Sequence, residues 1–389
     1  MAQAHVKITT RGAKRIRNGH LWVHRSDVRE PNDPAGGQIV RVADEAGNSV
    51  GRAFYSNRSE IALRFLTTGE ETIDREWWRA RLRQCAERRE SIAQETNAYR
   101  LVYSEGDLLP SLIVDVYDDV FVMQTLSQGT EQLKSTLAEL LVEEFTPRVI
   151  VERNDARVRE LEGLERRTAT IYGEATEEIE VNQHGVHFVV SPVSGQKTGA
   201  FLDQRENYLA ARRVAHGRAL DCFTFNGGFA LHVTSSCKSV LGIDISTDAI
   251  AAAQRNAELN GARNVEFRAA NVFDALREFE SMGERFDTIV LDPPAFAKNR
   301  ASLSSAARGY KEINLRALKL LNPGGVLVTC TCSYHVTEEM FLDLIADAAL
   351  DARRRVQLIE KRGQSSDHPV LLGVPETHYL KCVIARAVE

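Results

Sequence analysis

Residues 221–230 read DCFTFNGGFA, which predicts a strand, a glycine turn and the start of a helix. Gly227 and Gly228 carry no Cβ atom, so the backbone can approach a ligand closely at this turn. The helix that follows begins with N–H groups that have no partner inside the helix. Strands and helices alternate around this stretch from about residue 185 onward. Such alternation predicts an α/β fold, a parallel sheet covered by helices on both faces.

The strands expected in this sheet cover Ala219–Phe223, Ser239–Asp244, Val265–Ala270, Thr288–Asp292, Val326–Cys332, Val356–Lys361 and Tyr379–Arg386. The loop between the last two strands contains Gly363, Pro369 and Pro375 and is too broken for a regular helix. Because a parallel neighbour needs a long crossover connection, we expect the last strand to run antiparallel.

The amino-terminal half has a different pattern. Short β-rich segments separated by tight turns indicate a small barrel in residues 1–75, with strands at Leu21–Val23, Gly37–Val42, Ser49–Tyr55 and Ile61–Leu66. Residues 74–95 have helical spacing and predict a connecting helix. Residues 100–180 follow the order strand, strand, helix, strand, strand and carry no catalytic motif. We therefore expect three parts, at 1–75, 76–182 and 183–389.

Composition narrows the class of protein. The 389 residues are 43% hydrophobic and 26% charged, as in ordinary soluble proteins. No apolar run approaches the roughly 20 residues that span a bilayer, and the first residues lack a signal-peptide core, so we expect a cytoplasmic protein that does not engage a membrane. Six cysteines without a second Cys/His cluster predict neither a disulfide framework nor a bound metal.

Charge is unevenly distributed along the chain. The net charge is −5, yet residues 1–30 carry +5 and the remainder −10. A basic segment on an acidic body is typical of local contact with the phosphates of a nucleic acid. A solvated charged face explains the same pattern equally well.

Carboxylates and an amide stand at the ends of the first three strands of the sheet. Asp244 ends the second strand, 23 residues after Asp221, and can accept both hydroxyls of a ribose. Asn271 follows the third strand, where it can face an adenine edge. These positions suit NAD as well as S-adenosylmethionine, but the absence of a G-x-G-x-x-G motif weakens the dinucleotide interpretation.

Two later strand ends indicate a site for a nucleobase. Residues 292–296 read DPPAF, and residues 329–335 read TCTCSYH. Pro293 and Pro294 give a rigid turn, Phe296 can stack on a flipped base, and Asp292 can bind a ring nitrogen. Cys332 places a thiol at the same edge of the sheet. A thiolate is what methylation at a pyrimidine ring carbon requires, although a cysteine that only fills space is the alternative.

Several motifs together resemble a known family. They read GHLWV at 19–23, EGDLLPSL at 105–112, QKTGAFLDQR at 196–205, DPPAF at 292–296, RGY at 308–310, TCS at 331–333 and DHP at 367–369. With these motifs the chain resembles the class I, S-adenosylmethionine-dependent 5-methylcytosine methyltransferases of large-subunit ribosomal RNA that carry an amino-terminal PUA domain. The resemblance implies a PUA barrel, a middle α+β domain and a Rossmann-like methyltransferase domain.

The resemblance also implies roles for individual residues. Cys332 would be the nucleophile and ribosomal RNA the substrate, and a homodimer is compatible with the sequence. Asp292 is expected to be the second catalytic residue for a separate reason, because its position suits protonation of ring nitrogen 3 or a hydrogen bond to it. The residues expected to bind S-adenosylmethionine are Thr198, Asp203, Arg205, Asp221, Phe223, Asn226, Gly227, Asp244, Ile245 and Asn271. Relatives often carry aspartate at position 271, so we expect weaker binding through the Asn271 carbonyl. Ala295 stands where many RNA cytosine methyltransferases carry a second cysteine.

Two other functions remain open at this point. Asp-Pro-Pro followed by an aromatic residue also suits methyl transfer to an exocyclic amine of a purine, which needs no thiol. A non-catalytic RNA-binding assembly factor would need no cofactor.

Overall fold

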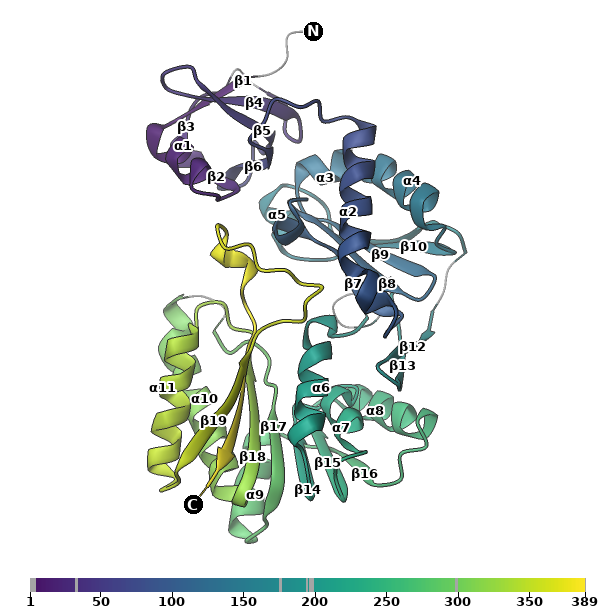
Figure 1. The fold of residues 1–389 in the computed structure, drawn as a ribbon, viewed down its shortest axis with the longest axis vertical. Helices are drawn as coiled ribbons and strands as arrows, with labels where there is room; N and C mark the ends of the chain where they lie inside the picture. The colour runs from purple at the N-terminus through teal and green to yellow at the C-terminus, as the bar shows by residue number, and fades with distance from the viewer. Residues whose placement is uncertain are drawn as a thin grey trace. The chain divides into compact units, whose positions relative to one another are not determined.

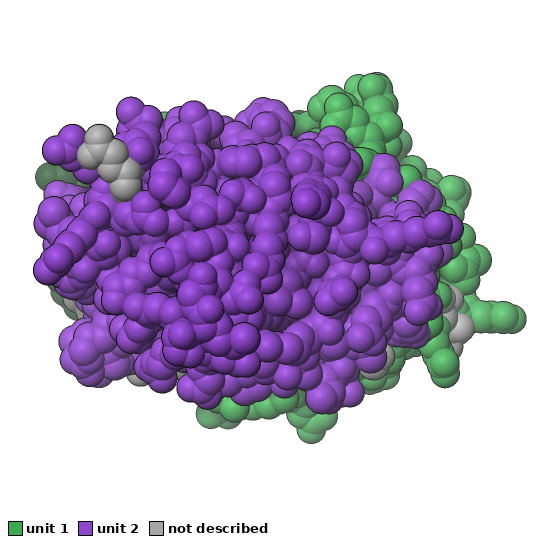
Figure 2. All heavy atoms as spheres, turned by 90° about the horizontal axis from the view of Figure 1, so that it is seen from below, with its two compact units in different colours: residues 1–184, 190–202, 367–377 green, residues 185–189, 203–366, 378–389 purple. Residues whose placement is uncertain are grey.

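The computed structural model describes residues 5–31, 34–174, 177–193, 195, 199–297 and 300–388. The chain forms two compact units, which Figure 2 shows in different colours. Unit 1 comprises residues 1–184, 190–202 and 367–377, and unit 2 comprises residues 185–189, 203–366 and 378–389. The chain passes between the units at 184/185, 189/190, 202/203, 366/367 and 377/378. The first two of these points adjoin two short strands, β12 (Ile179–Gln183) and β13 (Val186–Val190). The three-part division expected from the sequence stays a prediction.

Unit 1 begins with a six-stranded sheet in the order β2-β6-β5-β4-β1-β3. Its strands are β1 (His5–Ile8), β2 (Trp22–His24), β3 (Val28–Pro31), β4 (Ile39–Asp44), β5 (Ser49–Tyr55) and β6 (Ile61–Thr67). The four strands expected from the sequence correspond to β2, β4, β5 and β6. One helix, α1 (Thr10–Arg17), follows β1 and is capped by the Thr9 hydroxyl, which accepts a hydrogen bond from the Gly12 N–H. Buried Val6, Val40 and Phe65 belong to the core of this sheet.

The second sheet of unit 1 has five strands in the order β11-β10-β9-β8-β7. Its elements are α2 (Arg75–Ala93), β7 (Ala98–Tyr103), β8 (Leu112–Tyr117), β9 (Val120–Thr125), α3 (Gln128–Gln132), α4 (Lys134–Phe145), β10 (Val149–Asn154), α5 (Val158–Leu161) and β11 (Arg167–Tyr172). Helix α2 confirms the expected connecting helix and is capped by Asp74. Phe54 of β5 stacks on Trp78 of α2, so the first sheet and α2 share a core.

Unit 2 contains a seven-stranded sheet in the order β16-β15-β14-β17-β18-β20-β19. Its strands are β14 (Arg218–Cys222), β15 (Ser239–Asp244), β16 (Val265–Ala269), β17 (Phe286–Leu291), β18 (Leu321–Thr331), β19 (Val356–Arg362) and β20 (Lys381–Ala387). The first five run parallel. Strand β20 lies between β18 and β19 and is antiparallel to both, which confirms the antiparallel last strand expected from the sequence.

Helices cover both faces of this sheet (Figure 1). They are α6 (Arg205–Val214), α7 (Gly228–Val233), α8 (Thr247–Leu259), α9 (Val272–Ser281), α10 (Leu303–Leu320) and α11 (Glu338–Asp351). Alternate strand residues enter two different cores: Ile289 and Leu291 pack with α9, α10 and α11, while Val290 packs with α6 and α7. This alternation is what a sheet buried on both faces requires. No helix in the described ranges has the length and apolar character needed to cross a bilayer.

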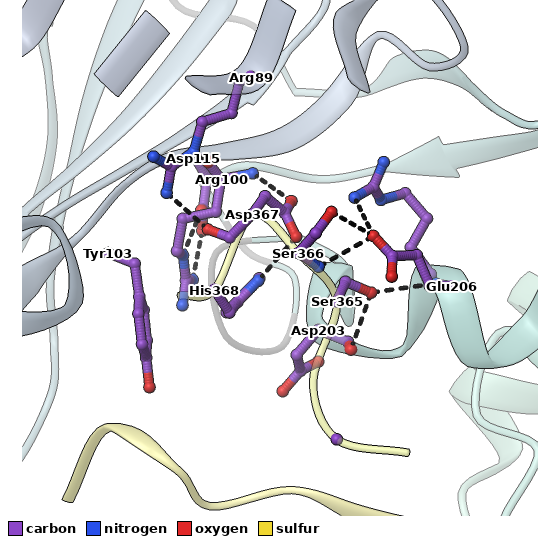
Figure 3. Close-up of polar contacts among 12 residues, drawn as sticks. Arg89, Arg100, Tyr103, Asp115, Asp203, Glu206, Ser365, Ser366, Asp367 and His368 are labelled. Atoms are coloured by element: carbon purple, nitrogen blue, oxygen red, sulfur yellow. Dashed lines mark hydrogen bonds and ion pairs between the residues drawn. The ribbon is translucent and has the colours of Figure 1, made fainter. Parts of the chain in front are cut away.

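A short segment from the β19–β20 connection, residues 367–377, belongs to unit 1. Arg89 of α2 donates to the Asp367 carbonyl at 2.8 Å, and the Arg100 N–H donates to the Asp367 carboxylate at 2.9 Å (Figure 3). The ring of His368 lies 5.1 Å from that of Tyr103. These contacts give the DHP motif a structural role, because they fix the start of the segment on α2 and β7.

Candidate active site

The candidate site lies at the carboxyl edge of the sheet in unit 2. Asp221 is the fourth residue of β14, Asp244 ends β15, Asp292 follows β17, and Cys332 follows β18. The strand order reverses between β14 and β17, since β15 and β16 extend to one side of β14 and β17 and β18 to the other. In open α/β sheets, ligands bind outside the carboxyl ends of the strands at such a reversal.

The glycine turn after β14 has an unusual backbone. Phe223, Phe225 and Gly227 have φ angles of 65°, 51° and 90°, in the left-handed region that non-glycine residues rarely adopt. Two hydrogen bonds hold the turn against β15: the Phe225 N–H donates to Asp244 Oδ2 at 3.0 Å, and the Thr224 N–H donates to the Ile243 carbonyl at 3.0 Å. Strain of this kind is often stored at ligand sites.

Asp221 is a buried carboxyl group with one unused oxygen. Its Oδ2 accepts hydrogen bonds from Thr224 Oγ1 at 2.6 Å and from the Ala230 N–H at 2.9 Å. Its Oδ1 is buried and has no partner among the described residues. Burial raises the pKa of this carboxyl group to about 7. A cationic donor placed at Oδ1 would therefore satisfy both the vacant acceptor and the buried charge.

Asp244 and Ile245 form a second part of the site. Asp244 Oδ1 accepts from the Ser246 N–H at 2.9 Å, and each carboxylate oxygen keeps a further lone pair that can accept a ribose hydroxyl. Ile245 is 70% exposed, which is unusual for a large apolar side chain directly after a core strand. An adenine ring lying on it would cover this surface.

The side-chain carbonyl of Asn271, which was expected to bind adenine, caps a helix in the structure. Its Oδ1 caps α9 by accepting from the N–H groups of Phe273 and Asp274, at 2.9 and 3.4 Å. The side-chain NH2 is the group left to face a ligand, so Asn271 would act as a donor to a ring nitrogen of adenine. The weaker binding expected from a carbonyl acceptor does not follow from this geometry.

The DQR sequence at residues 203–205 connects to the site through its middle residue. Gln204 Nε2 donates to Asp292 Oδ1 at 2.8 Å, and Gln204 Oε1 accepts from Asn207 Nδ2 at 2.7 Å. Gln204 was not expected as a site residue, although it stands between two that were. It fixes the orientation of the carboxylate expected to meet the base.

The other residues expected at the cofactor site have local partners in unit 2. Asp203 Oδ2 accepts from the Tyr379 hydroxyl at 2.6 Å, and its carbonyl accepts from the N–H and the hydroxyl of Ser365 (Figure 3). Arg205 is buried at the start of α6. Asn226 is half-buried in the glycine turn, and its carbonyl accepts from the Asn256 side chain. Thr198 lies outside the described residues.

Cys332 is held between two anchored neighbours. The Tyr310 hydroxyl accepts from Thr331 Oγ1 at 2.8 Å and bonds Ser333 Oγ at 2.9 Å. Ser333 Oγ also accepts from the Ala297 N–H at 3.1 Å, which connects this loop to the one after β17. Of the six cysteines, Cys332 is half-buried and the other five are buried. The polypeptide on both sides of Cys332 is therefore fixed, while the residue itself is only half-buried.

Only some residues of the loop after β17 are exposed at the candidate site. Pro294 is exposed and Pro293 is buried. The Phe296 ring is half-buried and packs against Tyr310 at 4.7 Å between ring centres, and against Phe273 at 6.0 Å. Phe296 is thus part of an aromatic cluster below the turn, so stacking on a base would use only the remaining free part of its ring.

Cys330 occupies a different environment from Cys332. It is opposite Cys382 in the β18–β20 ladder and fully buried. Burial raises the pKa of the Cys330 thiol, so this group stays protonated and packs as a small apolar side chain. Within the described ranges, no group of three or more His, Cys, Asp or Glu residues is placed to hold a metal ion.

Comparisons with known proteins agree with this architecture. Residues 6–68 match the PUA-like domain family, and residues 214–366 match a methyltransferase domain family. The fold and the site define an S-adenosylmethionine-dependent class I methyltransferase with an amino-terminal PUA-like domain. Curated relatives named ribosomal RNA large subunit methyltransferase I are 40% identical to the chain in Tolumonas auensis and in Aeromonas hydrophila, each covering 96% of this chain and 97% of the relative. The chain belongs to this family.

Solved structures show the same fold at low sequence identity. A methyltransferase solved as a complex with SAH has a TM-score of 0.84 and 19% identity, and the similarity covers 98% of this chain and 99% of that chain. An S-adenosylmethionine-dependent methyltransferase from Streptococcus mutans has a TM-score of 0.83, 18% identity and the same coverage. The fold therefore extends over nearly the whole length of both proteins.

Proposed function

We propose that this protein methylates carbon 5 of a cytosine in large-subunit ribosomal RNA, and that Cys332 forms a covalent bond to the base during the reaction. The observation that carries the proposal is the position of Cys332, a half-buried thiol fixed by its neighbours at the end of β18, one strand away from Asp292. The names of the curated relatives support ribosomal RNA as the substrate, and an RNA substrate of this kind implies a cytoplasmic location.

Carbon 5 of cytosine is a poor nucleophile and does not attack a methyl donor by itself. The reaction therefore requires a nucleophile from the protein, which activates carbon 5 by adding to carbon 6. The Cys332 thiolate adds to carbon 6, and a proton shared between Asp292 and ring nitrogen 3 neutralises the negative charge that develops on that nitrogen. Gln204 keeps Asp292 oriented through the 2.8 Å hydrogen bond. The resulting enamine makes carbon 5 nucleophilic. After carbon 5 has gained the methyl group, its proton passes to water, the electron pair of that C–H bond restores the double bond between carbons 5 and 6, and Cys332 leaves as the thiolate.

The cofactor residues form part of the same proposal. S-adenosylmethionine, when bound, supplies an electrophilic methyl group on a sulfonium. Asp221 Oδ1 would accept from its amino group, Asp244 from its ribose, and Ile245 and Asn271 would contact its adenine. Two observations fit these roles. The buried Oδ1 of Asp221 lacks a hydrogen-bond donor, which the amino group would supply, and the exposed apolar side chain of Ile245 would be covered by the adenine.

The nature of the methylated nucleoside tests the proposal directly. The full-length protein would be incubated with labelled S-adenosylmethionine and protein-free large-subunit ribosomal RNA, which would then be digested to nucleosides. We expect the label in 5-methylcytidine. Label in an N-methylated purine would replace the proposal with exocyclic-amine transfer, and no label with intact cofactor binding would indicate an RNA-binding factor without this activity.

The first sheet of unit 1 is the part proposed to hold RNA. Helix α1 packs in the same core as this sheet, and two of its basic side chains face carboxylates: Arg11 pairs with Asp27 at 2.8 Å and Arg17 with Asp44 at 2.7 Å. Lys14 on α1 is exposed and forms no ion pair among the described residues. It is the clearest candidate for a phosphate contact that the fold itself does not use.

Replacing Lys14 with alanine should weaken RNA binding and lower the slope of log affinity against log salt by about one, because one phosphate contact releases about one counterion. Binding isotherms at several salt concentrations would measure both quantities. Lys238→Ala is a matched control, since Lys238 is exposed beside the amino end of β15, at the opposite edge of the sheet from the site. An unchanged slope for Lys14→Ala would remove α1 from the RNA surface.

A further inference from the structure

Lys381 at the start of β20 is a buried cation that has no carboxylate partner in the part of the chain that the structure describes. Only 4% of the Lys381 surface is exposed. Its Nζ donates to the carbonyl of Ser333 at 3.4 Å and to that of Tyr379 at 3.2 Å. No carboxylate lies within 4.0 Å of it in the described ranges. Lysine is almost never buried without a charged partner, because removing an ammonium group from water is costly.

The location of Lys381 relates it to Cys332. The β18–β20 ladder pairs Thr331 with Lys381, and the Ser333 carbonyl that accepts from Nζ lies directly after the cysteine. The ammonium group is therefore bound to the same anchored turn that carries the thiol. Burial lowers the pKa of Lys381, and the nearby Cys332 thiolate raises it, so the two charges interact favourably.

The other titratable groups around Lys381 do not replace Cys332 as the partner of its ammonium group. Glu338, at the start of α11, raises the pKa of Lys381, but its carboxylate is held by Lys361 at 2.5 Å. His378 precedes β20, and burial together with the charge of Lys381 lowers its pKa, so its imidazole is neutral at pH 7. The anion that best complements the Lys381 ammonium group is a thiolate at position 332.

We propose that Lys381 is a positioning residue that stabilises the Cys332 thiolate through space and so raises the fraction of reactive thiolate at neutral pH. The thiol proton leaves to solvent when Cys332 ionises, and Lys381 keeps its own protons throughout. A thiol has an ordinary pKa of about 8.5, which falls when a lysine lies next to it. The inference deepens the proposed function, because a cysteine that adds to a base must be ionised first.

The test measures the thiol itself and uses neither RNA nor cofactor. The full-length protein would be alkylated with iodoacetamide at pH 6 to 10, and modification of the Cys332 peptide would be followed by mass spectrometry. The other cysteines are buried and serve as internal standards for the folded state. For Lys381→Met we expect the midpoint of the rate against pH to rise by about one unit, so the rate near pH 7 falls about tenfold while the rate at pH 10 is unchanged.

Two further variants separate charge from packing. Lys381→Arg keeps the positive charge and should restore most of the reactivity near pH 7. Lys238→Met removes an exposed lysine beside the amino end of β15, at the opposite edge of the sheet, and should leave the midpoint unchanged. An unshifted midpoint in Lys381→Met, or an equal shift in Lys381→Arg, would overturn the inference. Because alkylation needs no substrate, a shifted midpoint together with no 5-methylcytidine would instead reject the proposed function alone.

Discussion

Replacing Cys332 with alanine is expected to abolish methyl transfer while leaving the affinity for S-adenosylmethionine nearly unchanged. The thiol serves the base and not the cofactor, and without it carbon 5 of cytosine has no route to become nucleophilic. Loss of a nucleophile of this kind costs on the order of a thousandfold or more in rate. Single-turnover methyl transfer and calorimetric titration with the cofactor would measure the two quantities separately.

Cys330→Ala is the matched control for this prediction. It removes a thiol two residues before Cys332, inside β18, but one that is buried opposite Cys382 and stays protonated. We expect it to keep most of the activity. RNA that contains 5-fluorocytosine should trap the wild-type protein and Cys330→Ala as denaturant-resistant adducts, because fluorine cannot leave as the proton does. A normal rate in Cys332→Ala would reject the covalent mechanism.

The sequence predicted those parts of the fold that depend on local pattern. All seven strands of the large sheet were expected at nearly their observed positions, because their apolar runs are bounded by clear turn residues. Strand β7, which contains Arg100, was not among the strands expected from the sequence. In the structure Arg100 forms a two-bond contact with the buried Asp115, at 2.7 and 2.8 Å, and this pairing is invisible in the local sequence.

The sequence predicted those residues of the candidate site whose type and position at a strand end already indicate a role. It did not predict contacts that arise only from the order of the strands in the sheet. Asp221, Asp244, Asp292 and Cys332 each lie at or next to the carboxyl end of a strand, so their shared edge follows from a parallel sheet. Lys381 comes close to the Cys332 turn only because β20 inserts between β18 and β19. Asn271 was expected as an acceptor because its sequence position does not reveal that its carbonyl caps α9.

Asp221→Asn is expected to stabilise the unligated protein at neutral and higher pH. Burial raises the pKa of the Asp221 carboxyl group to about 7, whereas its ordinary value is 3.8. The neutral acid is therefore the favoured form in the fold, and the stability it contributes is lost as the pH rises from about 4 to about 7. A shift of three units corresponds to at most about 4 kcal/mol. Asparagine keeps an acceptor for Thr224 and Ala230 and cannot ionise.

Unfolding by urea at several pH values, without ligand, measures this difference. The advantage of Asp221→Asn over the wild type should be small near pH 4, grow with pH and become constant above pH 7. Asp248→Asn, in the exposed first turn of α8, is a control that should show no such trend. Parallel stability curves for the wild type and Asp221→Asn would show that this carboxyl group does not ionise in the range its burial implies.

Binding of S-adenosylmethionine should respond in the opposite direction to the same substitution. A cationic amino group at Oδ1 favours the ionised carboxylate, so wild-type affinity should rise as the pH passes through about 7. Asp221→Asn should bind about tenfold or more weakly above pH 7, because it loses a charge-assisted hydrogen bond worth about 1.5–3 kcal/mol. Comparing the two proteins at each pH cancels the titration of the ligand itself. A carboxyl group that lowers the stability of the empty protein and raises its affinity for the cofactor is expected at a binding site, whereas a purely structural carboxyl group would show only the first effect.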